Sequence, residues 1–235
     1  MARSGGAGVK LILFDIDGTL VLSGRAGARA MTQAFQEVLG VADGFENVPM
    51  AGRTDAWIVA QVAALGGMQY DDQLRERVHD TYVAHLRREI HQPGPQKGVL
   101  PGVRSLLEVL SLRTDAFLAL LTGNFEQGAR IKLEYFDLWR YFRCGAFGDA
   151  EQDRNSLLPM AVARAQAGGW TPADPSQVVI VGDTPLDVAV ARTGGARSVA
   201  VATGSFDTQS LQATGADVVL EDLGDLTTAV SALGL

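Results

Sequence analysis

The sequence predicts an α/β fold in which a doubly wound parallel sheet carries an inserted, all-helical segment. Apolar runs of strand length occur at 11–14, 116–121 and 178–181, and near-continuous runs of this kind are typical of strands buried on both faces. In the C-terminal part of the chain, segments of helical periodicity alternate with such runs, which implies right-handed crossovers in one sheet. Between residues 23 and 91, by contrast, only helical patterns occur.

The segment after the first strand contains three predicted helices. Apolar residues recur at helical spacing over 27–39. Thr54 and Asp55 are residue types that favour a helix N-terminus, so a second helix is expected to run to residue 65. The stretch 71–90 is amphipathic. Its predicted inward-facing residues are Leu74, Val78, Tyr82 and Leu86.

The stretch HQPGPQKGVLPG, residues 91–102, has three prolines and three glycines and therefore marks a linker. We accordingly expect a core formed by residues 1–22 and 99–235, and a helical cap formed by residues 23–98. Beyond the linker, predicted helices and strands alternate as far as residue 221. The expected helices are 103–111, 125–136, 155–167, 185–194 and 207–213, and the expected strands are 116–122, 143–148, 177–183, 197–203 and 216–221.

Composition excludes several classes of function. The chain has 235 residues, 47% of them hydrophobic, which suffices for an ordinary core. Its net charge of −7 opposes nonspecific binding to nucleic acid. No segment reaches the roughly 20 apolar residues of a membrane helix, and the opening residues do not form a signal peptide. The single cysteine, Cys144, fits a reducing compartment, so we expect a cytoplasmic protein. Nothing in the sequence indicates an oligomeric state.

Polar residues follow three of the predicted strands. In open α/β sheets, ligands bind outside the carboxyl ends of the strands, so these residues are expected to converge. They are Asp15 and Asp17 after the apolar run 11–14, Thr122, Gly123 and Asn124 after the run 116–121, and Asp183 and Asp187 after the run 178–181. Four carboxylates at one place would repel one another unless a cation lay among them. Hard oxygen ligands of this kind suit Mg²⁺.

The two acids after the first strand also suit nucleophilic catalysis. One carboxylate, ionised beside a metal, can attack, while a second in a different environment transfers protons. We assign Asp15 to attack and Asp17 to proton transfer.

Three motifs, DIDGTL, LTGN and GDTPLD, resemble the signature motifs of the haloacid dehalogenase superfamily of phosphohydrolases, in the usual order. The resemblance covers roughly residues 9–22 and 99–222. The helical insertion is similar to the small four-helix cap of that superfamily.

The resemblance implies specific roles for the acids. Asp15 would form an aspartyl-phosphate, and Asp17 would protonate the leaving group and then activate water. Asp183, the Asp15 carboxylate and the Asp17 backbone carbonyl would hold Mg²⁺, and Asp187 would position a metal-bound water or a neighbouring base. Relatives that dehalogenate lack the second Asp, so Asp17 favours phosphoryl chemistry.

The resemblance also assigns the phosphate donors. They would be Thr122 and the Gly123 or Asn124 amides, as at a helix N-terminus.

One motif departs from the family pattern. The family usually has a lysine between LTGN and GDT, where this chain reads GDAEQDRNSLLPMA. Arg154 is the best substitute, because its fixed charge can bridge Asp15 and the phosphate. Lys132 is the rival. It lies about two turns into its helix, roughly 12 Å from the helix start at the usual rise per residue, and is expected on a solvated face.

The cap is expected to supply selectivity, because the core motifs contact only the phosphate. Arg53, in AGRTD, stands at the start of a cap helix. Two interpretations stay open: Arg53 points into the cleft, or Thr54 and Asp55 cap the helix and Arg53 is solvated.

Together these features predict a Mg²⁺-dependent phosphatase for a small phosphorylated metabolite, similar to the phosphoglycolate phosphatase branch. The alternatives are a phosphosugar mutase resembling β-phosphoglucomutase and, in another class, a noncatalytic phosphate-ligand-binding protein.

Overall fold

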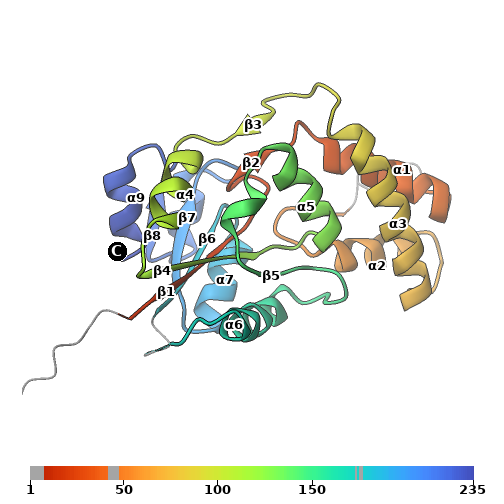
Figure 1. The fold of residues 1–235 in the computed structure, drawn as a ribbon. Coiled ribbons are helices and arrows are strands. Elements are labelled where there is room, and N and C mark those ends of the chain that lie inside the picture. Colours follow the sequence, from red (N-terminus) through yellow and green to blue (C-terminus); the bar gives the residue numbers. More distant parts are fainter. Residues whose placement is uncertain (1–7, 42–47, 173, 175–176) are drawn as a thin grey trace, which may run out of the picture.

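A six-stranded parallel sheet forms the centre of the computed structural model, which describes residues 8–41, 48–172, 174 and 177–235 (Figure 1). The strand order is β5-β4-β1-β6-β7-β8, and each neighbouring pair is parallel. The strands are β1 (Lys10–Phe14), β4 (Ala116–Leu121), β5 (Gly145–Ala146), β6 (Val178–Gly182), β7 (Arg197–Val201) and β8 (Val218–Leu220). The predicted α/β sheet is therefore confirmed.

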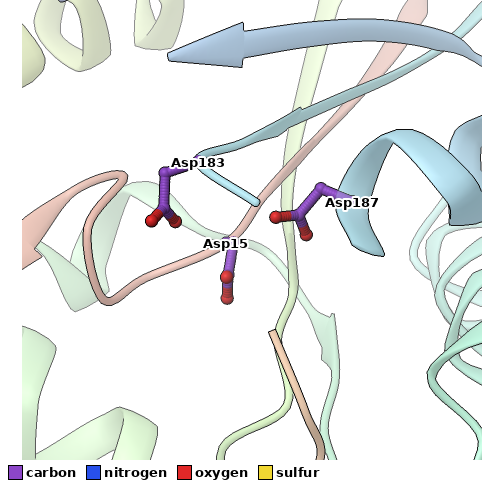
Figure 2. Close-up of side chains that lie close together, drawn as sticks. All are labelled: Asp15, Asp183 and Asp187. Carbon is purple, nitrogen blue, oxygen red and sulfur yellow. The ribbon is translucent and has the colours of Figure 1, made fainter. Parts of the chain in front are cut away.

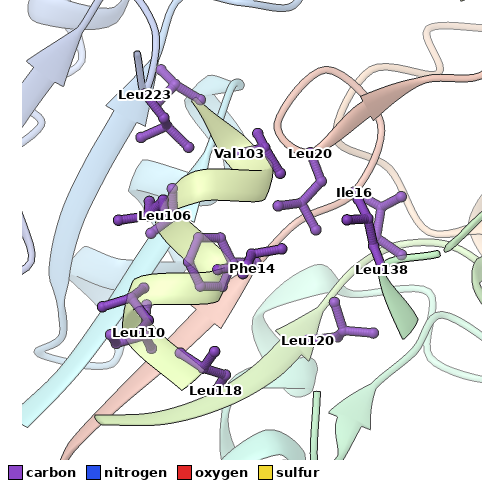
Figure 3. Close-up of a cluster of buried hydrophobic side chains, with 14 of the residues drawn as sticks. Phe14, Ile16, Leu20, Val103, Leu106, Leu110, Leu118, Leu120, Leu138 and Leu223 are labelled. Carbon is purple, nitrogen blue, oxygen red and sulfur yellow. The ribbon is translucent and has the colours of Figure 1, made fainter. Parts of the chain in front are cut away.

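Helices cover both faces of the sheet, as the alternation of side chains along β1 requires. Ile12 and Phe14 lie in a buried cluster with residues of α4 (Val103–Ser111) and α9 (Leu226–Ala232) (Figure 3). Leu11 and Leu13 face the other way and pack with residues of α6 (Leu157–Ala167) and α7 (Pro185–Thr193). The helix α8 (Thr208–Ala213) lies beside β7 and β8. The sheet is thus doubly wound.

The helical segment leaves and rejoins the core through a short antiparallel pair, β2 (Val21–Leu22) and β3 (Gly98–Val99). The described residues of this segment, 23–41 and 48–97, form three helices: α1 (Ala26–Leu39), α2 (Asp55–Leu65) and α3 (Asp72–Glu89). The family cap that the insertion resembles has four helices. The four residues of α3 predicted to face inward are all buried in a cluster that belongs mainly to this segment. We call residues 23–97 the cap segment.

One core helix also packs against the cap segment. The helix α5 (Glu126–Tyr135) follows β4, and both Phe125 and Ile131 join the hydrophobic cluster of the cap segment. The sequence did not predict β2, β3, α9 or the short 3₁₀ turns η1 (Trp139–Tyr141) and η2 (Arg154–Ser156). Strands of two residues and single turns are too short to show a periodicity. Among the described helices, none has the length and hydropathy needed to cross a bilayer.

Candidate active site

Three buried carboxylates meet at the carboxyl edge of the sheet, as Figure 2 shows. Asp15 follows β1, Asp183 follows β6, and Asp187 lies in the first turn of α7. One oxygen from each lies within 4.8 Å of the others. All three residues are at most 5% exposed. The adjacency of β1 and β6 in the sheet therefore brings together two motifs that lie far apart in the sequence.

Arg154 joins two of these carboxylates. Its Nη2 lies 3.0 Å from Asp15 Oδ2 and 2.5 Å from Asp187 Oδ1, and its Nη1 donates to the Gly52 carbonyl oxygen at 2.9 Å. The side chain is 5% exposed. The structure thus pairs Arg154 with Asp15, one of the two partners that the sequence predicted for it. A guanidinium suits this place because its planar fork can serve several acceptors at once.

Asp187 is held from its own helix as well. Its Oδ2 accepts from the backbone N–H of Thr184 at 3.0 Å and from the Thr184 hydroxyl at 2.7 Å. The Asp187 N–H donates to the Thr184 hydroxyl oxygen at 3.4 Å, which completes a capping box at the start of α7. Because Oδ1 binds Arg154, both oxygens already have protein partners. Asp187 is therefore held from two sides, by Arg154 and by the first turn of α7.

Asp15 and Asp183 are the acids that fit a cation. Burial raises the pKa of both, and for Asp183 the neighbouring charge of Asp15 raises it further. A divalent ion would remove this penalty. Asp183 Oδ1 accepts from Thr19 at 3.1 Å. Gly18 and Gly204 leave room around its other oxygen, since a Cβ there would lie 2.4 and 1.7 Å from Oδ2. This donor set suits a hard cation.

Asp17 lies at the side of this cluster in a separate network. Its Oδ2 accepts from Lys132 Nζ at 2.6 Å and from Asn124 Nδ2 at 3.0 Å, and Lys132 Nζ also donates to Asn124 Oδ1 at 2.6 Å. The Lys132 side chain is only 6% exposed. Burial alone would lower the pKa of Lys132, but the charge of Asp17 and other nearby acidic groups raises it above its ordinary value.

The expectation that Lys132 is solvated was therefore wrong. Side chains of a helix point back toward its N-terminus. The long side chain of Lys132 therefore extends back along α5 toward the site, although its backbone lies about two turns into the helix. A signal was present in the sequence. Lys132 shares the buried face of α5 with Gly128, Ala129 and Leu133, where a lysine without a partner is rare.

The loop after β4 contacts both the acids and the cap segment. The Thr122 hydroxyl hydrogen-bonds the Asp15 carboxylate and accepts from Asn124 Nδ2 at 2.8 Å. A Cβ at Gly123 would lie 2.0 Å from the Arg53 carbonyl oxygen, and the Gly123 carbonyl accepts from the Asp55 N–H at 2.7 Å. Only glycine allows the cap segment to approach this closely.

A cavity of about 630 Å³ opens between the carboxylates and the cap segment. The cavity is lined by the residues of the core described above: Asp15, Asp17, Asp183, Thr122, Gly123, Asn124, Lys132 and Arg154. Arg53 lines it too, and its guanidinium lies 4.5 Å from the centre of the Trp57 ring. Thr54 caps α2, as its hydroxyl accepts from the Trp57 N–H. Both interpretations of AGRTD therefore hold in part, because Arg53 is exposed and also borders the cavity.

Two of the charged residues that line the cavity, Asp55 and Arg25, were not predicted from the sequence as site residues. Asp55 is buried, and its Oδ2 accepts from the Phe125 N–H at 2.8 Å. Burial raises the pKa of Asp55 to about 7, although Lys132 opposes that shift. Arg25 is an exposed cation at the start of α1 with a positive φ of 63°. Asp55 was assigned only to a helix start, and a helix preference alone does not reveal a buried contact.

Comparisons with known proteins identify the family. A family model described as HAD-hydrolase-like matches residues 156–226. The phosphoglycolate phosphatase of Synechococcus elongatus is 30% identical over 233 residues, which cover 96% of this chain and 99% of that protein. This chain belongs to the haloacid dehalogenase-like hydrolases. Within that family its enzyme class is phosphoric monoester hydrolase.

Two further relatives support the same family. The phosphoglycolate phosphatase of Chromobacterium violaceum is 29% identical and covers 93% of this chain and 95% of its own length. The crystal structure of a hydrolase from Pseudomonas syringae has a TM-score of 0.68 at 25% identity, over 94% of this chain and 98% of that one. The haloacid dehalogenase-like assignment therefore extends over the cap segment as well as the core.

Proposed function

We propose that this hydrolase is a Mg²⁺-dependent phosphatase of small phosphorylated metabolites and that it acts through a phosphorylated Asp15. The observation that carries the proposal is the position of Asp15 at the cavity wall, paired with Arg154 and beside Asp183. An ionised carboxylate that faces a cavity next to a fixed cation suits attack on an anionic phosphoryl group.

In the first half-reaction, Asp15 is the nucleophile and Asp17 is the general acid. An oxygen of Asp15 attacks phosphorus and forms a P–O bond while the bond from phosphorus to the leaving oxygen breaks. Asp17 gives its proton to that oxygen, so the product leaves as an alcohol. Arg154, Thr122 and the amides of Gly123 or Asn124 hydrogen-bond the phosphoryl oxygens during the transfer.

The second half-reaction restores the enzyme. Asp17, now a carboxylate, takes a proton from water while the water oxygen attacks phosphorus. The bond between phosphorus and Asp15 breaks, and inorganic phosphate leaves. Mg²⁺, held by the Asp15 and Asp183 carboxylates and the Asp17 backbone carbonyl, would neutralise charge on the phosphoryl oxygens. Asp187 keeps Arg154 in place through both halves.

Two features of the cavity support the proposed substrate class. A volume of about 630 Å³ suits a small metabolite, and Arg53 and Arg25 border it as exposed cations. A guanidinium can bind a carboxylate through two parallel hydrogen bonds. We therefore propose substrates that carry a carboxylate near the phosphoester, of which phosphoglycolate is the model, in agreement with the names of several curated relatives.

The test is a turnover screen of the purified protein with phosphoglycolate, other phosphorylated acids and neutral phosphomonoesters. We expect phosphate release that requires Mg²⁺ and is most efficient with phosphoglycolate or a similar acid. In a parallel reaction with β-glucose 1-phosphate and glucose 1,6-bisphosphate, formation of glucose 6-phosphate with little free phosphate would refute the phosphatase in favour of a mutase.

A further inference from the structure

The network around Asp17 has a geometry that the proposed reaction does not by itself require. Lys132 and Asn124 both donate to the same oxygen, Oδ2, and they are also bonded to each other. Asn124 is fixed in turn by the Thr122 hydroxyl. Among the described residues, no protein group is bonded to the other oxygen of Asp17, and this side chain is 40% exposed on the cavity side. The carboxylate therefore has one occupied and one open oxygen.

We propose that Lys132 is a positioning residue that, with Asn124, turns Asp17 so that its Oδ1 faces the leaving group. The inference rests on the proposed function, in which Asp17 transfers the proton. An oxygen that accepts two N–H bonds has no room for a proton of its own. The acidic form must then carry its proton on Oδ1, and the basic form must accept from water at Oδ1. Both half-reactions use the same open oxygen.

The surroundings of Lys132 explain why it can act as a fixed support. Lysine is seldom fully buried unless it is paired. A Cβ at Gly27 of α1 would lie 3.2 Å from Nζ and 3.3 Å from Cε, so this glycine provides the space for the ammonium group. One turn before Lys132, a Cβ at Gly128 would lie 2.9 Å from the ring of the buried Tyr82. Residues of the cap segment thus close the pocket around Lys132.

A leaving-group comparison separates positioning from a merely structural ion pair. An alkoxide leaves poorly without a proton, whereas 4-nitrophenolate is stable and needs none. The ratio kcat/KM reports the steps up to departure of the leaving group, so it isolates the acid step from later hydrolysis. Loss of a well-placed acid should therefore reduce kcat/KM for ethyl phosphate far more than for 4-nitrophenyl phosphate.

The experiment measures kcat/KM of wild type, Lys132→Met, Lys132→Arg and Gly27→Ala with both substrates and with phosphoglycolate. For Lys132→Met we expect a loss of about 100-fold with ethyl phosphate, the scale of general acid catalysis, and a change within about threefold with 4-nitrophenyl phosphate. Lys132→Arg should recover part of the loss. The matched control is Arg130→Met on the same helix, since Arg130 is 60% exposed and contacts Glu134 and the Trp139 ring rather than the network around Asp17; it should leave both values unchanged.

Gly27→Ala keeps Lys132 but crowds its ammonium group, so kcat/KM for ethyl phosphate should fall by less than in Lys132→Met while the value for 4-nitrophenyl phosphate stays nearly constant. This variant provides the test if Lys132→Met does not fold. Equal losses with both phosphates in folded protein, or no loss with either, would overturn the inference. So would a loss confined to phosphoglycolate, which would make Lys132 a substrate-carboxylate ligand. Wild type that releases no phosphate from any of the three substrates would refute the proposed function itself.

Discussion

At the core side of the cavity, Asp15, Arg154 and Asp187 are buried and bound to one another, whereas at the cap side Arg53 is exposed and stacks on Trp57. The core groups come from strand ends and first helical turns, so the sheet fixes their positions. Arg53 comes from a loop, and its charge has no carboxylate partner among the described residues. The difference supports the proposed division of roles, in which the core side is organised for chemistry before substrate arrives and the cap side selects the substrate.

The structure suggests how the core side tolerates so much buried charge. Arg154 lies between two carboxylates, and the Thr184 capping box satisfies the remaining oxygen of Asp187. Among the described residues, Thr19 is the one hydrogen-bond donor to the Asp183 carboxylate, and burial raises the pKa of Asp183 well above the ordinary value. This acid is therefore the one whose charge most needs a bound cation.

The largest expected effect is at Asp183. At a Mg²⁺ concentration that saturates the wild type, Asp183→Ala should lower kcat/KM by about 10⁴-fold, because a bound metal contributes several kcal/mol of charge stabilisation in the transition state. EDTA should abolish wild-type turnover and added Mg²⁺ should restore it, as followed by phosphate release. A Mg²⁺ titration of Asp183→Ala that matched the wild type would place the metal elsewhere.

The second-largest loss of activity is expected at Arg154. Its removal takes away a donor to the phosphoryl oxygens, so Arg154→Ala should lose about 10³-fold in kcat/KM, the upper end of the loss for one donor that stabilises transition-state charge. Arg154→Lys keeps the charge but not the fork and should retain part of the rate. Arg192→Ala, in the last turn of α7, is the control and should be nearly silent. Near-normal rates in Arg154→Ala, with an inactive Lys132→Ala, would reassign the third motif.

Asp55 lies where the two sides meet, and it should affect stability more than rate. Because burial raises its folded pKa to about 7, the folded protein holds more protons than the unfolded chain between about pH 4 and 7. Its contribution to stability must then fall as pH rises through that window. Asp55→Asn has no such titration.

We therefore expect the free energy of unfolding of Asp55→Asn, relative to wild type, to increase by up to about 4 kcal/mol between pH 4 and pH 8. Denaturant unfolding at each pH measures it. The exposed Asp80→Asn, whose side chain is 81% exposed, is the control. A difference between Asp55→Asn and wild type that stayed constant with pH would show that Asp55 is ionised throughout.

The smallest effect belongs to Arg53. Arg53→Ala should raise KM for phosphoglycolate by about tenfold with kcat nearly unchanged, the pattern of lost ground-state binding. Neutral phosphomonoesters should show little change. Equal KM increases for charged and neutral substrates would mean that Arg53 only stabilises the loop over Trp57, and the cap side would lose its proposed role.

The same contrast explains what could be predicted from sequence. The position of Asp15, Asp17, Asp183 and Asp187 at one edge of the sheet could be predicted, because parallel strand ends converge there and the motifs are contiguous in the sequence. Arg154 was found by its chain position, and its contacts agree with that placement. Lys132 was misplaced and Asp55 was missed. Both depend on contacts between the cap segment and the core, which helical periodicity does not encode.

The central claim is that Asp15 becomes phosphorylated during turnover. Mixing the protein and Mg²⁺ with phosphoglycolate, quenching in acid within milliseconds and mapping peptides by mass spectrometry tests it most directly. We predict a phosphorylated peptide that contains Asp15, that decays as phosphate appears, and that is absent from Asp15→Asn, which should also be inactive although folded. Phosphate release by Asp15→Asn at the wild-type rate, or label confined to another residue, would contradict the account.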